Sequence, residues 1–343
     1  MTTPEGDIGG QPAQSPILSA RDLRVQFAGG PGAGRARAVD GVNLDLYPRE
    51  ILALVGESGC GKTTLARTLL GLVRPWSGEV WFAGKVLSYA APSLKTYRRQ
   101  VQLVLQDPTG SLNPRHTVYE AVAEGLRIHG ARALGSFTDE AAKVADALSR
   151  AGLRPPERFF LRYPHELSGG QRQRVVIAGA LVLDPQVIVA DEPVASLDAS
   201  VRGEVLKLVL ALRDDSGLSA LVVTHDLALA WNIADRVAVM YLGRIVETGP
   251  VEKILRSPEH PYTCALVSVI SEARGKEPVI LGGEPPDPAR IPKGCRFHPR
   301  CPALASGAAV AAGVEASCRG IDLPILPGGS DARVACHLYP ISS

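Results

Sequence analysis

One segment limits what this chain can fold into more than any other. Residues 56–63 read G-E-S-G-C-G-K-T and match the phosphate-loop pattern G-x-x-x-x-G-K-[ST] in full. The wholly apolar run Ile51–Val55 precedes the loop, and apolar residues follow it at helical spacing from Leu65 to Val73. This order predicts a buried parallel strand, a tight loop and a helix. A chance glycine-rich turn would lack these flanking elements, so we predict a loop whose backbone N–H groups surround phosphate oxygens.

The residue types within the loop predict how a nucleotide is held. Lys62 can reach the β and γ phosphates of ATP, and the hydroxyl of Thr63 can bind Mg²⁺. Cys60 is interpreted as a small filler residue rather than a redox switch. The nucleotide contacts predicted here are Gly56, Glu57, Ser58, Gly59, Cys60, Gly61, Lys62, Thr63 and Thr64.

Two carboxylates follow a second apolar run. Val187–Ala190 predicts a buried strand, and Asp191 and Glu192 come directly after it. Two acidic residues at a strand end are often helix caps, but beside a complete phosphate loop a catalytic interpretation is favoured. Asp191 is placed to bind Mg²⁺ (the Walker B position), and Glu192 to orient or deprotonate the attacking water.

A third motif points to a family. Residues 167–171 read L-S-G-G-Q, stand 20 residues before the second apolar run and lead into a long helical pattern. Ser168 is placed to cap that helix, and the free N–H groups at its start form a second anion site. The pentapeptide resembles the signature of ATP-binding-cassette (ABC) proteins. The resemblance implies that Ser168, Gly169, Gly170 and Gln171 contact the γ-phosphate held by a second subunit, so hydrolysis requires a dimer.

Further segments resemble other ABC elements in the expected order. Gln106 resembles the Q-loop glutamine that senses magnesium and contacts the membrane partner, and Asp198 lies in a segment that resembles the D-loop at the dimer interface. His225 resembles the switch histidine that touches the γ-phosphate. Phe27 is placed to stack on adenine, where many relatives have Tyr. The resemblance implies that Glu192, His225, Gln106 and Lys62 are the catalytic residues and that Thr63, Gln106 and Asp191 bind Mg²⁺.

The family resemblance also implies the fold and its divisions. The fold class is α/β, a P-loop NTPase of the ABC nucleotide-binding type. It has a RecA-like parallel sheet core, an antiparallel β subdomain, a helical subdomain and a small cysteine-containing C-terminal appendage. We expect a loose tail over residues 1–16, the nucleotide-binding domain over 17–270 with its helical subdomain at about 96–170, and the appendage over 271–343.

Several segments narrow the resemblance to one group of transporters. Residues 106–115, 163–167 and 260–263 (H-P-Y-T) look like the oligopeptide/dipeptide importer ATPases, a group that includes nickel and glutathione importers. Residues 56–61 and 111–115 are closer to the F-type subunit than to the D-type. The implied partners are a second ABC ATPase (a D-type paralogue, or a second copy of this chain), two transmembrane permease subunits and an extracytoplasmic solute-binding protein.

Four of the six cysteines gather near the C-terminus, within a region whose segment 294–302 resembles the same family's C-terminal signature. Four thiolates can hold a [4Fe-4S] cluster or a tetrahedral Zn²⁺, and the wide spacing favours iron–sulfur. Four unligated thiols, or a redox-labile disulfide pair, are the alternatives. The candidate ligands are Cys295, Cys301, Cys318 and Cys336.

The composition excludes other classes of protein. The net charge of +2 predicts no nucleic-acid surface, and the longest apolar run, Val175–Leu183, is nine residues long where a membrane helix needs about 20. With a polar N-terminus that lacks a signal-peptide pattern, we expect a peripheral protein on the cytoplasmic face of the membrane. The rival class is a soluble ABC ATPase acting on ribosomes or DNA ends. One cassette and no heptad run argue against it.

Overall fold

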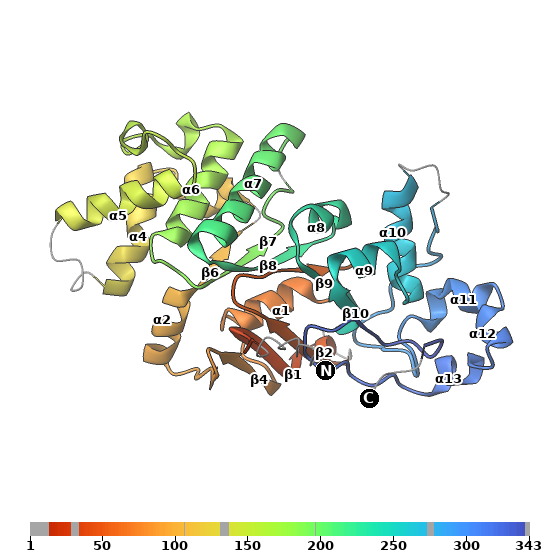
Figure 1. Ribbon diagram of the computed structural model, residues 1–343. Coiled ribbons are helices and arrows are strands. Elements are labelled where there is room, and N and C mark those ends of the chain that lie inside the picture. Colours follow the sequence, from red (N-terminus) through yellow and green to blue (C-terminus); the bar gives the residue numbers. More distant parts are fainter. Residues whose placement is uncertain are drawn as a thin grey trace, which may run out of the picture.

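The computed structural model describes residues 14–28, 34–105, 107–130, 137–195, 197–272 and 278–339. Two sheets and a group of helices account for most of these residues (Figure 1). The helices α4, α5 and α6 gather on one side of the larger sheet, and the short helices α11, α12 and α13 lie on the opposite side of the molecule (Figure 1). No helix among the described residues is both long enough and apolar enough to cross a membrane.

The smaller sheet is antiparallel and is built from the N-terminal part of the chain. Its strand order is β2-β1-β4-β5, and its strands are β1 (Leu18–Phe27), β2 (Ala36–Leu46), β4 (Ser77–Phe82) and β5 (Lys85–Val86). A connection joins β1 to β2, which begins at Ala36; residues 29–33 of that connection lie outside the described part.

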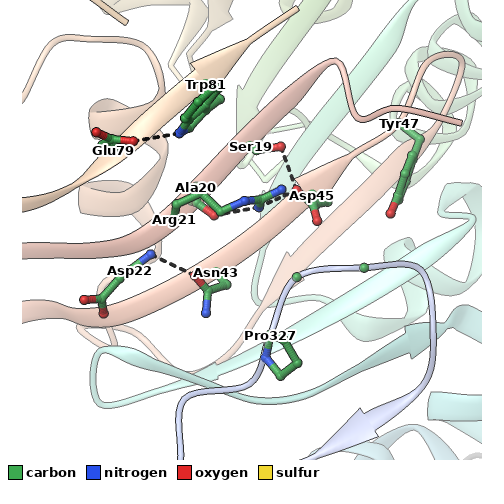
Figure 2. Close-up of polar contacts among 12 residues, drawn as sticks. Ser19, Ala20, Arg21, Asp22, Asn43, Asp45, Tyr47, Glu79, Trp81 and Pro327 are labelled. Atoms are coloured by element: carbon green, nitrogen blue, oxygen red, sulfur yellow. Dashed lines mark hydrogen bonds and ion pairs between the residues drawn. The ribbon is translucent and has the colours of Figure 1, made fainter. Parts of the chain in front are cut away.

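Side-chain contacts tie β1 to β2 on the polar face of this sheet, as Figure 2 shows. Asp45 accepts hydrogen bonds from the Ser19 hydroxyl and the Arg21 guanidinium, each at 2.6 Å. Asn43 accepts from the backbone N–H of Asp22 at 2.8 Å. The Asn43 side chain also donates to the carbonyl of Leu326 at 2.9 Å. The C-terminal region is thereby attached to the antiparallel sheet.

The larger sheet has seven strands in the order β11-β10-β9-β3-β8-β7-β6. Strands β9, β3, β8, β7 and β6 pair in parallel, whereas β10 pairs antiparallel with β9 and β11. The strands are β3 (Ile51–Val55), β6 (Val101–Val104), β7 (Val187–Asp191), β8 (Ser219–Thr224), β9 (Arg236–Tyr241), β10 (Arg244–Pro250) and β11 (Arg333–Val334).

The central strands β3, β8 and β9 are fully buried, as the apolar runs that make up most of each strand predict. Parallel register brings Val55, Thr224 and Asp191 to one edge of the sheet. One expectation is wrong here: the helical subdomain cannot start at residue 96, because β6 (Val101–Val104) is a strand of this sheet and pairs with β7. A four-residue strand between helical patterns leaves too little periodicity to be recognised.

The helices cover the larger sheet and form the separate group beside it. They are α1 (Lys62–Leu69), α2 (Ala91–Gln100), α3 (Pro108–Ser111), α4 (Val118–Gly130), α5 (Phe137–Arg150), α6 (Gly169–Leu181), α7 (Ala199–Ser216), α8 (Leu227–Ile233), α9 (Val251–Arg256) and α10 (Pro261–Glu272), with single 3₁₀ turns η1 (Pro156–Arg158) and η2 (Pro164–Glu166). Helix α1 is shorter than the apolar spacing predicts. It ends at Leu69, and Leu72 is 50% exposed in the turn that follows.

The C-terminal region contains only short elements, which agrees with its loss of hydrophobic periodicity. They are η3 (His298–Arg300), α11 (Pro302–Ala305), α12 (Ala308–Ala311), α13 (Glu315–Gly320) and the edge strand β11. Buried ion pairs and aromatic contacts fasten the region to the rest of the protein. The guanidinium of Arg296 pairs with the carboxylate of Asp40 on β2 and donates to the carbonyl of Leu242 at 2.6 Å.

Candidate nucleotide site

The predicted phosphate loop connects the buried strand β3 to helix α1. Gly61 caps the helix with φ at 109°, and a Cβ atom there would lie 2.0 Å from the carbonyl oxygen of Ala38. Only glycine fits this close approach. The Lys62 ammonium is buried and donates to the carbonyls of Gly56 at 2.6 Å and Glu57 at 3.0 Å. The ammonium is therefore already held inside the loop, next to the N-terminus of α1.

Asp191, the last residue of β7, lies beside this loop. The Thr63 hydroxyl is 3.4 Å from a carboxylate oxygen of Asp191. Burial raises the pKa of Asp191 above its usual value, although the Thr63 hydrogen bond lowers it and the nearby Glu192 charge raises it. Two oxygen ligands side by side fit Mg²⁺, which takes one or two protein ligands and completes its shell with phosphates and waters.

Glu192 stands at a sharp turn directly after β7. Its φ is 51°, in the left-handed region that residues other than glycine rarely adopt, and its N–H donates to the carbonyl of Val223 at 2.9 Å. The turn aims its carboxylate at His225, whose Nδ1 lies 2.6 Å from the Glu192 carboxylate. The His225 side chain is 62% exposed and that of Glu192 17%. Both side chains therefore stand at the same edge of the sheet as the phosphate loop.

The signature segment, residues 167–171, lies at the start of α6. The Ser168 hydroxyl accepts from the N–H of Gln171 at 3.2 Å, and the Gln171 side chain accepts from the N–H of Ser168 at 3.1 Å. This is a capping box, as the sequence predicts for Ser168. A Cβ on Gly170 would lie 2.4 Å from a methyl group of Val201 on α7, so glycine lets the two helices pack closely. Ser168 itself is exposed.

The structure does not bring the signature segment to the chain's own phosphate loop. Among the described residues, no hydrogen bond or ion pair joins 167–171 to 56–63. Asp198, at the start of α7, is also exposed. Phe27 ends β1 with 46% of its surface exposed. The predicted Gln106 lies outside the described residues.

Two contacts of the phosphate loop were not predicted from the sequence. The Arg300 guanidinium donates to both carboxylate oxygens of Glu57, at 2.7 and 3.0 Å. The hydroxyl of Tyr262 accepts from the Glu57 N–H at 2.7 Å. The partners are 243 and 205 residues away along the chain, so no local pattern could have revealed them.

The four C-terminal cysteines line one small cavity, together with His260. All are free thiols, and burial raises the pKa of Cys295 to about 11 and that of Cys336 to about 12. The described residues nevertheless contain no group of three or more His, Cys, Asp or Glu side chains placed so that it could hold a metal ion. The four thiols therefore share one cavity, but as they lie they form no metal-ligating group.

A model of the ABC transporter family matches residues 39–195, and one of the oligopeptide/dipeptide transporter C-terminal region matches residues 246–306. The oligopeptide transport ATP-binding protein AppF of Bacillus subtilis (strain 168) is 39% identical over 338 residues, covering 95% of this chain and 98% of that protein.

Two further relatives are similar. The oligopeptide transport ATP-binding protein OppF of Salmonella typhimurium is 44% identical over 299 residues, covering 83% of this chain and 88% of that protein. The glutathione import ATP-binding protein GsiA of Salmonella paratyphi A is 47% identical over 264 residues, covering 75% of this chain but 42% of that protein.

Solved structures share the fold. The cbiO1 protein of Clostridium perfringens, part of the ABC transporter complex cbiONQ, aligns with a TM-score of 0.64 at 28% identity and covers 76% of this chain and 96% of its own. The dimeric ATP-binding cassette MJ0796, in a post-hydrolysis state bound to ADP and Pi, aligns with a TM-score of 0.61 at 28% identity and covers 68% of this chain and 99% of its own.

A phosphate loop at the edge of a parallel sheet, with two carboxylates and a histidine at the same edge, defines the class of this protein as a P-loop ATPase. Its relatives narrow the class. The chain belongs to the ATP-binding subunits of ABC transporters, and within them to the oligopeptide/dipeptide type.

Proposed function

We propose that this chain hydrolyses ATP to power an ABC importer of oligopeptides or dipeptides, as one half of a nucleotide-sandwich dimer. One observation supports the dimer. The phosphate loop and its catalytic neighbours are assembled within the chain, whereas Ser168 of the signature segment is exposed and no hydrogen bond among the described residues joins that segment to the loop. Two chains placed head to tail would supply each loop with the other's signature.

The proposed chemistry is transfer of the γ-phosphoryl group to water by positioning and electrostatics. Lys62 leaves its carbonyl partners and binds the β and γ phosphates. Glu192 orients the water and accepts its proton, and His225 contacts the γ-phosphate. Bound Mg²⁺, held by Thr63 and Asp191, would neutralise phosphate charge. Ser168 of the opposite subunit would complete the site.

Other predicted contacts remain part of the proposal. Phe27 would stack on adenine, Asp198 would lie at the dimer interface, and Gln106 would bind Mg²⁺ and pass the closure of the dimer to the permease subunits. Hydrolysis would reopen the dimer, as a ligand-driven population shift.

The proposed cargo and assembly follow the relatives. The names of AppF and OppF specify oligopeptide transport, so peptides lead, and the name of GsiA makes glutathione the second candidate. The proposed assembly pairs this chain with a D-type ATPase or a second copy, two permease subunits and an extracytoplasmic solute-binding protein, at the cytoplasmic face of the membrane. The proposed domain division keeps 17–270 as the nucleotide-binding domain and 271–343 as the appendage.

Uptake by cells that lack this subunit tests the proposal. Labelled tripeptide and labelled glutathione are offered to a deletion strain that carries the wild-type chain or Lys62→Ala. We expect tripeptide uptake with the wild type and none with Lys62→Ala. Glutathione uptake alone would move the cargo to the second candidate, and uptake that is independent of Lys62 would refute the powering role.

We also propose that the cysteine cavity binds a metal, a [4Fe-4S] cluster or Zn²⁺. What supports it is that four thiols line one cavity; what opposes it is that they form no ligating group as they lie. The test is the iron, acid-labile sulfide and zinc content of anaerobically purified protein, beside a Cys295→Ser/Cys301→Ser variant. About four irons with sulfide, or about one zinc, lost in the variant, would establish the site, and no metal would refute it.

A further inference from the structure

Glu57, the second residue of the phosphate loop, is the point at which the loop is held. Its N–H donates to the Tyr262 hydroxyl at 2.7 Å. Its carbonyl accepts from the Lys62 ammonium at 3.0 Å and from the N–H of Cys60 at 3.3 Å. Its carboxylate accepts both arms of the Arg300 guanidinium. Every polar group of this residue is therefore engaged, and one of its partners is the lysine expected to bind phosphate.

The contact with Arg300 has the geometry of a strong ion pair. Two parallel N–H···O bonds of 2.7 and 3.0 Å form a bidentate fork, and the third donor of Arg300, Nε, bonds the carbonyl of Gly282 at 3.2 Å. The Arg300 side chain is 6% exposed and that of Glu57 27%. The Glu57 hydrogen bonds raise the pKa of Arg300 above its usual value. The arginine is therefore largely buried, while part of the Glu57 side chain remains open to water.

The segment that carries Arg300 is itself fixed. Arg296 pairs with the buried carboxylate of Asp40. Phe297 is 1% exposed and makes aromatic contacts with Tyr241 and Tyr262, at ring-centroid distances of 5.1 and 5.3 Å. Tyr262 is the residue that bonds the Glu57 N–H, so the same cluster holds both sides of Glu57. The C-terminal region and the phosphate loop are therefore joined through Glu57.

The negative charge of Glu57 opposes the ATP binding proposed above. ATP brings a multiply charged anion to a loop that carries a carboxylate at its second position, and like charges in a poorly hydrated site repel. A cation bound to that carboxylate removes the repulsion and also fixes the backbone around it. Arg300 meets both requirements, because its fork neutralises the charge and restricts the orientation of Glu57.

We propose that Arg300 is a positioning residue of the nucleotide site: it neutralises Glu57 and fixes the phosphate loop in the form that accepts ATP. The C-terminal region thereby contributes to nucleotide affinity without touching the nucleotide. This inference rests on the proposed nucleotide site, but the two can fail separately.

A purely structural ion pair makes a different prediction from a charge-neutralising one. If the pair only stabilises the fold, breaking it from either side has the same effect on ATP affinity. If Arg300 neutralises Glu57, removal of the Arg300 side chain leaves the unneutralised Glu57 carboxylate in the loop. Glu57→Gln instead leaves the Arg300 guanidinium as an unpaired cation beside the phosphates. The two single variants then differ in their effect on ATP binding.

The experiment measures the affinity of the full chain for MgATP by calorimetry, with steady-state ATPase kinetics and a melting curve for each variant. We expect Arg300→Ala to weaken affinity roughly ten- to hundredfold, as loss of a charged hydrogen-bond partner does. Glu57→Gln should lose less affinity than Arg300→Ala, and Glu57→Gln/Arg300→Ala should recover most of the loss seen in Arg300→Ala. The effect should fall mainly on KM, and added salt should reduce it.

Arg319→Ala is the matched control, because Arg319 is an exposed arginine of the same region that pairs with Glu315 four residues away. It should change nothing. Arg300→Lys, which keeps the charge but loses the fork, should be intermediate, and it serves if Arg300→Ala does not fold. Unchanged affinity in the Arg300 variants, or equal losses in Arg300→Ala and Glu57→Gln without recovery in the double variant, would overturn the proposal. Full affinity in Lys62→Ala would instead refute the nucleotide site itself.

Discussion

Two glycine-containing segments, the phosphate loop and the signature segment, both begin a helix, but their hydrogen-bond partners come from different parts of the chain. The phosphate loop follows a strand that is fully buried, and two residues from beyond position 260 bond its Glu57. The signature segment follows a 3₁₀ turn, and among the described residues its exposed Ser168 hydroxyl bonds only within its own capping box. Distant residues donate to or accept from the first segment, whereas the hydrogen bonds of Ser168 in the second are local.

The difference shows how the catalytic parts are divided between chains. A loop that must keep a fixed geometry around a polyphosphate gains from many anchors, because each removes freedom that binding would otherwise have to remove. A segment that must meet another chain has to leave its N–H donors outward and free. The phosphate-loop half of the site is complete in one chain, whereas the signature half has to come from a partner chain.

The largest effect on turnover is expected among the catalytic residues next to the phosphate loop. Glu192→Gln removes the carboxylate proposed to accept the proton of water while leaving the loop intact, so ATP should bind normally and turnover should fall roughly 10²- to 10⁴-fold. Calorimetry with MgATP and a phosphate-release assay check the two halves of this expectation. Glu204→Gln, on the exposed face of α7, is the control. Substantial turnover in Glu192→Gln would remove Glu192 from its proposed role.

Arg296→Ala tests whether the C-terminal region anchors the phosphate loop. This change removes the nearest partner of the buried Asp40 carboxylate, which keeps the longer contacts with Arg24 at 3.2 Å and Arg37 at 3.6 Å. We expect the free energy of unfolding to fall by about 1.5–3 kcal/mol, as for the loss of one hydrogen bond to a charged group. Urea denaturation followed by circular dichroism measures it. Arg319→Ala should cost less than about 1 kcal/mol, because its ion pair is exposed. Equal losses in the two variants would mean that the C-terminal region does not anchor the loop.

A substitution in the signature segment should lower turnover without changing the ATP affinity of the isolated chain. Ser168→Ala removes the cap of α6, at a cost of about 1 kcal/mol of stability, and removes a proposed contact to the partner's γ-phosphate. Turnover should fall roughly tenfold, as for the loss of one hydrogen bond to a charged group, while ATP affinity of the isolated chain stays unchanged. Loss of ATP affinity in dilute Ser168→Ala would contradict the division between the two halves.

The sequence predicted the parts of the site that are local and missed those that are not. Residues 51–73 identify the phosphate loop, since a buried strand, glycines and a helix follow one another within a short stretch. The bidentate contact of Arg300 with Glu57 joins positions 243 residues apart, and no periodicity encodes it. Strand β6 was missed because four residues are too few to show a period, and α1 was drawn too long because Leu72 continues the spacing in an exposed turn.

The smallest effect concerns the pH dependence of the anchor. Burial raises the pKa of Asp40, but the hydrogen bond and charge of Arg296 outweigh it, so its net pKa lies below the usual value. A carboxyl group with a lowered pKa in the folded state stabilises the protein above its unfolded pKa of about 3.9, and that contribution disappears as the pH falls through the folded value.

The urea midpoint of the wild type should therefore fall below about pH 4, whereas Asp40→Asn should start lower at pH 5 and depend less on pH. Asp331→Asn, an exposed carboxyl paired with Arg333, should follow the wild type. Parallel curves for the wild type and Asp40→Asn would show that the Asp40 charge does not contribute to holding the C-terminal region. The contrast between the anchored loop and the self-contained signature would then have to rest on Glu57, Arg300 and Tyr262 alone.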